Sequence, residues 1–191
     1  MSKVTNIMIA GVGGQGTILA GRILSVLAQN AGYEVKVSEV HGMSQRGGSV
    51  VTQVRYGEQV HAPIITPGEA DVLLAFEKLE ALRMLPLLRE GGRLLVNAQE
   101  LLPMPVLSGA AEYPENIEEL LTAAADNITV LDAYALAEEA GSAKAVNTVL
   151  LGKLSQSMEF AEQDWLAALE ACVKPKFLPL NQKAFALGRG A

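Results

Sequence analysis

The first forty residues place apolar and polar side chains in an order that predicts a strand, a helix and a second strand. An almost continuously apolar run at 7–10 is typical of a central strand covered on both faces of a parallel sheet. From 15 to 30, apolar residues recur at the spacing of one helix face, and Gly32 is a natural stop. Alternation at 33–40 predicts the next strand, which brings Glu39 near its carboxyl end, the edge where ligands bind in open α/β sheets.

The middle of the chain predicts more strands and a sheet of mixed direction. Alternation at 50–56 predicts a strand, and 57–58 are expected to turn the chain into 59–61, which makes a hairpin. Further buried strands are predicted at 71–76, 93–98 and 128–131. The hairpin is expected to run antiparallel to the other strands.

The helix after the third buried strand is expected to begin at Glu77 and to turn its leucines inward. These are Leu79, Leu82 and Leu85. Pro86 is expected to kink or restart this helix, and the glycine pair 91–92 to end it. Residues 99–114 contain three prolines and are predicted to form an ordered crossover rather than a flexible linker.

The remaining pattern is mainly helical. Helices are predicted at 115–125, 133–140, 142–158, 165–172 and 181–187. Gly152 lies inside one of them and costs stability unless another helix or another subunit packs against it. We therefore expect one domain over 1–191, with a Rossmann-like open, mostly parallel (mixed) sheet, helices on both faces, and a helical C-terminal part from about 142.

Composition excludes several classes of protein. Hydrophobic residues make up 50% of the 191 positions and charged residues 19%, which excludes a disordered chain. The formal net charge of −6 and the pI near 5.0 argue against a nucleic-acid binder. Glycines interrupt the uncharged run at 4–21, so no membrane span is expected and the chain is interpreted as cytoplasmic. The single cysteine, Cys172, cannot hold a four-thiolate iron–sulfur cluster or a structural zinc ion, and no metal site is expected.

A glycine-rich turn joins the first strand to the first helix and is the first candidate site. Gly11, Gly13 and Gly16 fit G-x-G-x-x-G in the required context. We expect Gly11 to make a turn closed to other residues, Gly13 and Gly14 to let backbone N–H groups approach a ligand, and Gly16 to let the helix sit close to the sheet. The helix N-terminus then favours a phosphate or carboxylate. The alternative is a tight turn that serves packing alone.

The second candidate site is the segment 38–50, which places polar side chains between glycines. Arg46 lies where a mobile loop can close a bidentate contact on a carboxylate or phosphate. The alternative is a solvated loop arginine. His41 belongs to the same segment, and a structural or rim role is favoured over catalysis by this lone histidine.

A nucleotide-binding dehydrogenase is the first class to test against these residues. The glycine turn would hold a pyrophosphate, and Glu39 would bind a ribose hydroxyl at the end of the second strand. However, such an enzyme also needs an acid–base group and a substrate domain, and no second lobe is visible in the pattern.

Two long motifs carry a resemblance to a known family. GVGGQGTILAG (11–21) and SEVHGMSQRGGSVVTQVRYG (38–57), followed by DVLLAFEKLEALR, resemble the gamma-type subunits of the 2-oxoacid:ferredoxin oxidoreductases. Within that family the chain is most similar to the small, beta, subunits of the indolepyruvate type. The resemblance covers nearly the whole chain, including NTVLLGKL at 147 and NQKAFALG at 181.

The resemblance implies a subunit of an enzyme that oxidatively decarboxylates an aryl 2-oxoacid to an acyl-CoA. Thiamine diphosphate, magnesium and iron–sulfur clusters would lie on a large (alpha) partner subunit, which passes electrons to ferredoxin, and coenzyme A would be a co-substrate at a shared site. The two motifs assign the cofactor-binding role to Gly11, Gly13, Gly14, Gln15, Gly16, Thr17, Ser44, Gln45, Gly47 and Gly48. Arg46 would contact the substrate or coenzyme A, and His41 is a weaker candidate for the same site.

Other readings remain open at this point. The chain could instead be an independent NAD(P)-linked oxidoreductase or a nucleotide-binding regulatory domain. If the chain is such a subunit, we expect it to be catalytically inactive without its partner. Gly152 and the apolar stretch 101–107 suggest surface that another subunit covers, and the isolated chain could also form a homodimer.

Overall fold

The described residues of this computed structural model, 4–41 and 48–191, form a six-stranded sheet with helices on both faces. The strands lie in the order β2-β3-β1-β4-β5-β6. Their bounds are β1 (Val4–Val12), β2 (Glu34–His41), β3 (Ser49–Gly57), β4 (Ala70–Ala75), β5 (Leu88–Asn97) and β6 (Asn127–Leu131). The α/β class and the central place of the first strand are therefore confirmed.

The sheet is mixed, as expected, but its antiparallel pairing differs from the predicted hairpin. β1, β4, β5 and β6 pair in parallel, whereas β3 runs antiparallel to both β1 and β2. Residues 59–61 form no strand. Side chains hold the following segment instead, since Arg55 Nη1 donates to the carbonyls of Ala62 at 2.9 Å and Ile64 at 2.8 Å. The predicted turn at 57–58 therefore does not start a hairpin.

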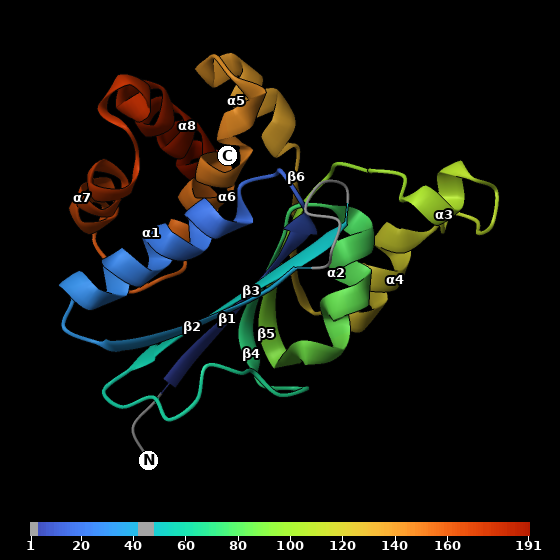
Figure 1. Ribbon diagram of the computed structural model, residues 1–191, viewed down its shortest axis with the longest axis horizontal. Helices are drawn as coiled ribbons and strands as arrows, with labels where there is room; N and C mark the ends of the chain where they lie inside the picture. Colours follow the sequence, from blue (N-terminus) through green and yellow to red (C-terminus); the bar gives the residue numbers. More distant parts are fainter. Residues whose placement is uncertain (1–3, 42–47) are drawn as a thin grey trace.

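Two layers of helices cover the sheet. The helices are α1 (Thr17–Asn30), α2 (Lys78–Met84), α3 (Met104–Leu107), α4 (Ile117–Ala124), α5 (Ala133–Ala140), α6 (Val146–Ser155), α7 (Glu162–Cys172) and α8 (Leu178–Gly190). α1 and α5–α8 pack on one face, and α2 and α4 pack on the other (Figure 1). The crossover from β5 carries α3, which projects from the body of the molecule (Figure 1). No helix in ranges 4–41 and 48–191 is long and apolar enough to cross a membrane.

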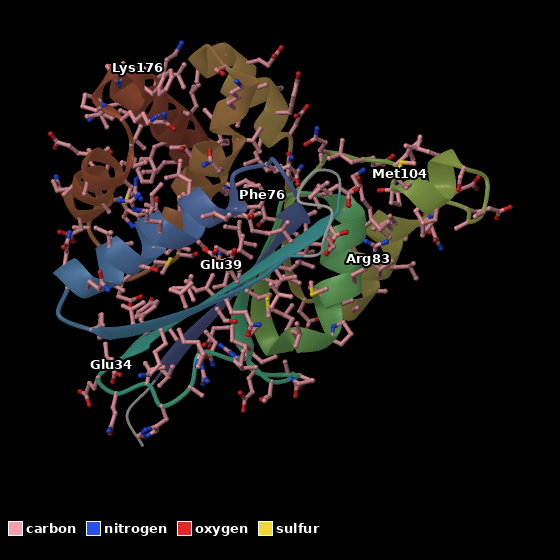
Figure 2. The ribbon with its side chains drawn as sticks, in the orientation of Figure 1. Glu34, Glu39, Phe76, Arg83, Met104 and Lys176 are labelled. Atoms are coloured by element: carbon pink, nitrogen blue, oxygen red, sulfur yellow. The ribbon has the colours of Figure 1, made fainter. Side chains whose placement is uncertain are left out.

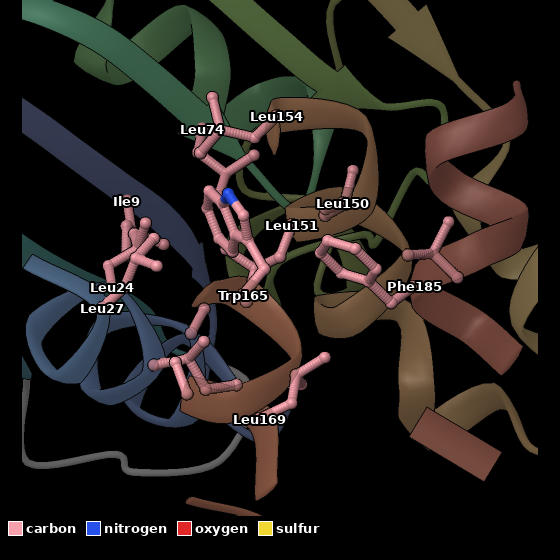
Figure 3. Packing of buried hydrophobic residues seen from close by; sticks show 14 of the residues in the cluster. Ile9, Leu24, Leu27, Leu74, Leu150, Leu151, Leu154, Trp165, Leu169 and Phe185 are labelled. Carbon is pink, nitrogen blue, oxygen red and sulfur yellow. The ribbon is translucent and has the colours of Figure 1, made fainter. Parts of the chain in front are cut away.

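The larger core lies between the sheet and the C-terminal helices. Trp165 of α7 is fully buried, with its ring centroid 5.8 Å from that of Phe185 on α8 and 6.4 Å from that of Phe160 (Figure 3). Ile9 of the central strand and Leu24 of α1 complete this side of the sheet. The helical C-terminal part is thus packed into the main core and forms one side of the fold.

The helix α2 turns its leucines toward the smaller core, as predicted, but they are only partly buried there. Its fully buried residues are Glu80 and Ala81. The helix ends at Met84, and a short 3₁₀ turn, η1 (Leu85–Leu87), follows it. Pro86 in that turn locks its own backbone and removes a donor, so the chain enters β5 there. The glycine pair 91–92 therefore lies within β5 and does not end the helix.

Gly152 is covered by a helix of the same chain and not by another subunit. A Cβ at Gly152 would lie 2.1 Å from the carbonyl oxygen of Phe185 on α8. On the facing helix, a Cβ at Gly188 would lie 1.9 Å from the carbonyl oxygen of Val149 on α6. Each glycine thus allows the backbone of the other helix to approach, which explains why α6 tolerates it.

Candidate functional site

The loops that follow the parallel strands meet at one edge of the sheet. β2 runs in the same direction as β1, because β3 pairs antiparallel with both of them. The glycine turn after β1, the carboxyl end of β2 at His41 and the loops after β4 and β5 therefore share the carboxyl edge. This is the edge at which open α/β sheets bind ligands.

The glycine turn is a compact structure in which each glycine has a different role. Gly11 lies in β1 and makes no turn; a Cβ there would meet Thr17 Cγ2 at 2.9 Å and Phe76 Cβ at 3.0 Å. Gly14 (φ +105°) and Gly16 (φ +87°) have left-handed backbone that favours glycine. Among the described residues, none would lie within 4 Å of a Cβ at Gly14, so this part of the chain leaves the backbone at Gly14 open to a ligand.

The sequence predicts that Gly16 lets α1 sit close to the sheet, but the structure gives this role to Gly21. A Cβ at Gly21 would lie 2.6 Å from Thr52 Cγ2 on β3. Gly16 instead packs against Asn147 of α6, whose Nδ2 lies 3.0 Å from the Cβ position. The glycine turn is therefore held by the C-terminal helices as well as by the sheet.

Gln15 fixes the shape of the turn through its side-chain amide. Its Oε1 accepts the N–H of Val12 at 2.7 Å, and its Nε2 donates to the carbonyl of Phe76 at 3.1 Å and to Gln99 Oε1 at 3.0 Å. These bonds tie the loops after β1, β4 and β5 together. The Gln15 side chain, which the resemblance places at a cofactor, is thus bonded to other protein groups. A ligand at this turn would therefore contact its backbone.

The glycine turn is tied to the second motif where that motif enters β3. The N–H of Gly13 donates to the carbonyl of Gly48 at 2.9 Å. His41 ends β2, and its backbone lies in register with Val50. The other predicted site residues of this motif, Ser44, Gln45, Arg46 and Gly47, lie outside the described residues. The structure therefore brings the two predicted motifs together at their described ends.

The N-terminus of α1 lies directly behind the turn. Gly16 is its N-cap and gives no side-chain acceptor, and the first three N–H groups of a helix have no acceptor within that helix. Thr17 is only 4% exposed, so this end is partly enclosed by protein. These N–H donors and the positive end of the helix dipole make the position suitable for a phosphate or carboxylate group.

The strand order disfavours dinucleotide binding. In a dinucleotide-binding fold, the second strand lies beside the first, so that its terminal acid reaches the ribose. Here Glu39 pairs with Thr52 of β3, which in turn pairs with Ile9 of β1. Glu39 is thus two strands, or about 10 Å, from the strand that leads into the glycine turn.

Sequence analysis missed a buried carboxylate that joins this edge to the crossover. Glu77 is 1% exposed; its Oε2 caps α2 by accepting the N–H of Glu80 at 3.0 Å. Its Oε1 accepts the N–H of Leu101 at 3.1 Å and the hydroxyl of Tyr113 at 2.7 Å. Burial, and after it the Glu77 carboxylate, raises the pKa of the Tyr113 phenol, which therefore stays a donor. Glutamate is an unusual N-cap, so only its place directly after a buried strand could have indicated this role.

A second buried carboxylate lies one helical turn further along α2. Glu80 is 2% exposed, accepts the hydroxyl of Ser49 at 2.5 Å, and pairs with Arg83 at 2.5 Å. Ser49 is the first residue of β3, so Glu80 anchors the point where the second motif re-enters the sheet. The position of that motif is thus coupled to α2.

A cavity of about 530 Å³ opens between these carboxylates and the crossover. The residues that line it are Val12, Gly48, Ser49, Glu77, Leu79, Glu80, Arg83, 101–105 and Leu107. This described lining is mainly apolar and includes two carboxylates and one guanidinium. Within the described ranges, no group of three His, Cys, Asp or Glu side chains could hold a metal ion.

Comparison with known proteins gives matches over nearly the whole chain. The family model for pyruvate ferredoxin/flavodoxin oxidoreductase matches residues 6–191. A protein of Thermococcus kodakarensis named indolepyruvate oxidoreductase subunit IorB is 42% identical, with 97% of this chain and 95% of the relative covered. A protein of the same name from Archaeoglobus fulgidus is 39% identical, with coverages of 96% and 92%.

Solved structures share the fold. The gamma subunit of a keto/oxoacid ferredoxin oxidoreductase from Geobacter sulfurreducens is 27% identical with a TM-score of 0.69, over 96% of this chain and 95% of that chain. A 2-oxoglutarate:ferredoxin oxidoreductase from Magnetococcus marinus gives a TM-score of 0.75 at 22% identity. It matches all of this chain but only 31% of its own, so the same fold occurs there as part of a longer chain.

Proposed function

The chain belongs to the pyruvate ferredoxin/flavodoxin oxidoreductase family, and we propose that it serves an indolepyruvate:ferredoxin oxidoreductase as its small subunit. The observation that carries the proposal is the 42% identity to the Thermococcus kodakarensis protein over 97% of this chain. The reaction is the oxidative decarboxylation of an aryl 2-oxoacid to carbon dioxide and an acyl-CoA, with ferredoxin as electron acceptor. Residues 1–191 act as one gamma-type domain in this proposal.

The residues of the chain support a division of the reaction between two subunits. A single cysteine cannot ligate a four-thiolate cluster, and the sequence contains no G-D-G…N motif for thiamine diphosphate. These groups, with magnesium, belong to a large partner subunit in this proposal. When bound there, they supply the decarboxylation and the electron transfer, and this chain completes the mouth of the shared site and is inactive alone.

The role of this chain is to bind an anionic part of coenzyme A. The open backbone at Gly14 and the donors at the N-terminus of α1 suit a phosphate group. The neighbouring cavity is less suitable for phosphate because the Glu77 and Glu80 carboxylates line it. We therefore place a phosphate over the glycine turn and not inside the cavity. The Magnetococcus marinus enzyme was solved with coenzyme A bound, which supports a coenzyme A site in this family.

The substrate class is tested by assaying the assembled enzyme over several 2-oxoacids. The chain and the large subunit would be co-expressed, and ferredoxin reduction measured with indolepyruvate, pyruvate, 2-oxoisovalerate and 2-oxoglutarate at matched concentrations. The proposal expects the highest kcat/KM for the aryl 2-oxoacid and a requirement for coenzyme A. A preference for pyruvate or 2-oxoglutarate would keep the family and reject the aryl substrate.

Replacing Arg46 by alanine should weaken the apparent affinity for coenzyme A or the 2-oxoacid by about ten- to a hundredfold. A charge-assisted hydrogen bond contributes about 1.5 to 3 kcal/mol, which corresponds to that range. Arg46→Lys should restore only part of the affinity, because an ammonium group cannot make the bidentate contact. Steady-state kinetics of the assembled enzyme measure both apparent affinities.

Arg22→Ala provides the control, since Arg22 is an exposed arginine on α1. It should leave both apparent affinities unchanged. If Arg46→Ala also keeps turnover and both affinities within about a factor of two, Arg46 is a solvated loop residue.

A further inference from the structure

The crossover between β5 and α4 exposes large apolar side chains on a projecting element. Leu102 is 50% exposed, Met104 69% and Leu107 62%. They lie on residues 101–107, which include α3 and which we call the crossover arm. Figure 2 shows Met104 on this arm, at the start of α3. The same arm forms one wall of the cavity described above.

The crossover arm is held in place by buried polar contacts at its base. The Glu77 carboxylate accepts the N–H of Leu101, where the arm begins, and the hydroxyl of Tyr113, beyond its end. Lys78 pairs with Glu100 at 3.0 Å and with Glu118, and contact with the Glu118 carboxylate raises the pKa of the Lys78 ammonium group. Two prolines within the arm restrict its backbone further. The apolar side chains are thus presented on a preordered support, which lowers the entropy cost of binding.

The surroundings of the crossover arm are acidic. Residues 99–120 contain five glutamates and no lysine or arginine. These are Glu100, Glu112, Glu115, Glu118 and Glu119, and all are exposed. Lys78 already pairs with Glu100 and Glu118, which leaves Glu112, Glu115 and Glu119, and the cavity lining adds two carboxylates against the single guanidinium of Arg83. An apolar surface with this rim fits a partner that presents apolar side chains together with positive charge.

We propose that the crossover arm and the cavity beneath it bind the large subunit, through a segment with an aliphatic or aromatic side chain beside lysine or arginine. This inference rests on the proposed function, which requires such a subunit. A second copy of this chain fits the surface less well, because a two-fold contact would bring two acidic rims together in a chain of net charge −6. The apolar side chain enters the cavity, and the cation faces the glutamates.

The test compares opposite charges at one exposed position. Met104→Lys removes the apolar contact and adds repulsion to a cationic partner, whereas Met104→Glu removes the same contact without that repulsion. Binding of the purified large subunit is measured by calorimetry. Met104→Lys should raise the Kd by about tenfold or more, and Met104→Glu by a smaller factor. Ile64→Lys and Ile64→Glu are the matched controls, since Ile64 is 49% exposed on the segment after β3, and both should bind like the unmodified chain.

Each outcome has a definite meaning. If the unmodified chain does not bind the large subunit, the proposed function fails and the inference falls with it. If the unmodified chain binds and both Met104 variants bind as tightly as it does, the proposed function stands and this surface is not the interface. If Met104→Glu weakens binding more than Met104→Lys does, the partner segment is not cationic and the proposal is wrong. If the isolated chain dimerises in sedimentation and Met104→Lys abolishes only the dimer, the occupant is a second copy.

Discussion

Replacing Gly188 by alanine should lower the free energy of unfolding by about 3 kcal/mol or more, although alanine is the better helix former. The new Cβ would lie 1.9 Å from the carbonyl oxygen of Val149, a backbone atom that cannot rotate away. α6 and α8 would have to separate, and Phe185 would lose its packing against Trp165. Asn147 of α6, which packs against Gly16 of the glycine turn, would also be displaced.

Urea unfolding followed by circular dichroism measures this effect. Gly190→Ala is the matched control, because Gly190 belongs to the same helix and a Cβ there would meet nothing within 4 Å. The control should keep or slightly raise the stability. If Gly188→Ala changes the free energy of unfolding by less than about 1 kcal/mol, the close contact between α6 and α8 is not present in solution.

Replacing Glu77 by alanine should be similarly damaging, with a loss of about 3 to 5 kcal/mol. The Glu77 carboxylate accepts from two backbone N–H groups and from Tyr113, and these donors would be left without their acceptor. Glu77→Gln should cost less, since a carbonyl oxygen can still accept from Leu101 and Tyr113, but an amide NH₂ cannot accept from Glu80. The crossover arm should become sensitive to proteases in the alanine variant.

Chemical unfolding and limited proteolysis with mapping of the cleavage sites test this prediction together. Glu100→Ala is the control, because Glu100 is exposed and its pairing with Lys78 should contribute no more than about 1 kcal/mol. An alanine variant of Glu77 that is as stable as the control, with no new cleavage in 99–114, would contradict the role given to this carboxylate.

Much of the fold could be predicted because its signals are local. The apolar run of β1, the helical spacing of α1 and Gly141 after α5 all indicate structure within about one element. The hairpin at 57–61 was wrong because side chains, and not a partner strand, bind this part of the chain: Glu34 accepts the N–H of Val60, and Arg55 and Gln53 bind the backbone at 62–65. The three leucines predicted to turn inward do pack against the smaller core but are only partly buried, and the pattern did not indicate that polar contacts bury Glu80 on the same helix.

The candidate site was less predictable because its contacts join residues far apart in sequence. The glycine motif located the turn, but not that Gln15 binds Gln99, or that Asn147 packs on Gly16. Gly21, which brings α1 close to β3, looks like any helix glycine without knowledge of Thr52 opposite it. Such pairs follow from the topology, which the pattern of one sequence does not specify.

The central claim is that this chain is one subunit of an oxidoreductase whose cofactors belong to its partner. The most direct measurement is ferredoxin reduction by the purified chain, by the purified large subunit, and by their mixture, with indolepyruvate and coenzyme A present. The account predicts no 2-oxoacid oxidation by the chain alone and coenzyme A-dependent activity in the mixture. Substantial oxidation of a 2-oxoacid, or reduction of NAD, by the rigorously purified chain alone would contradict it.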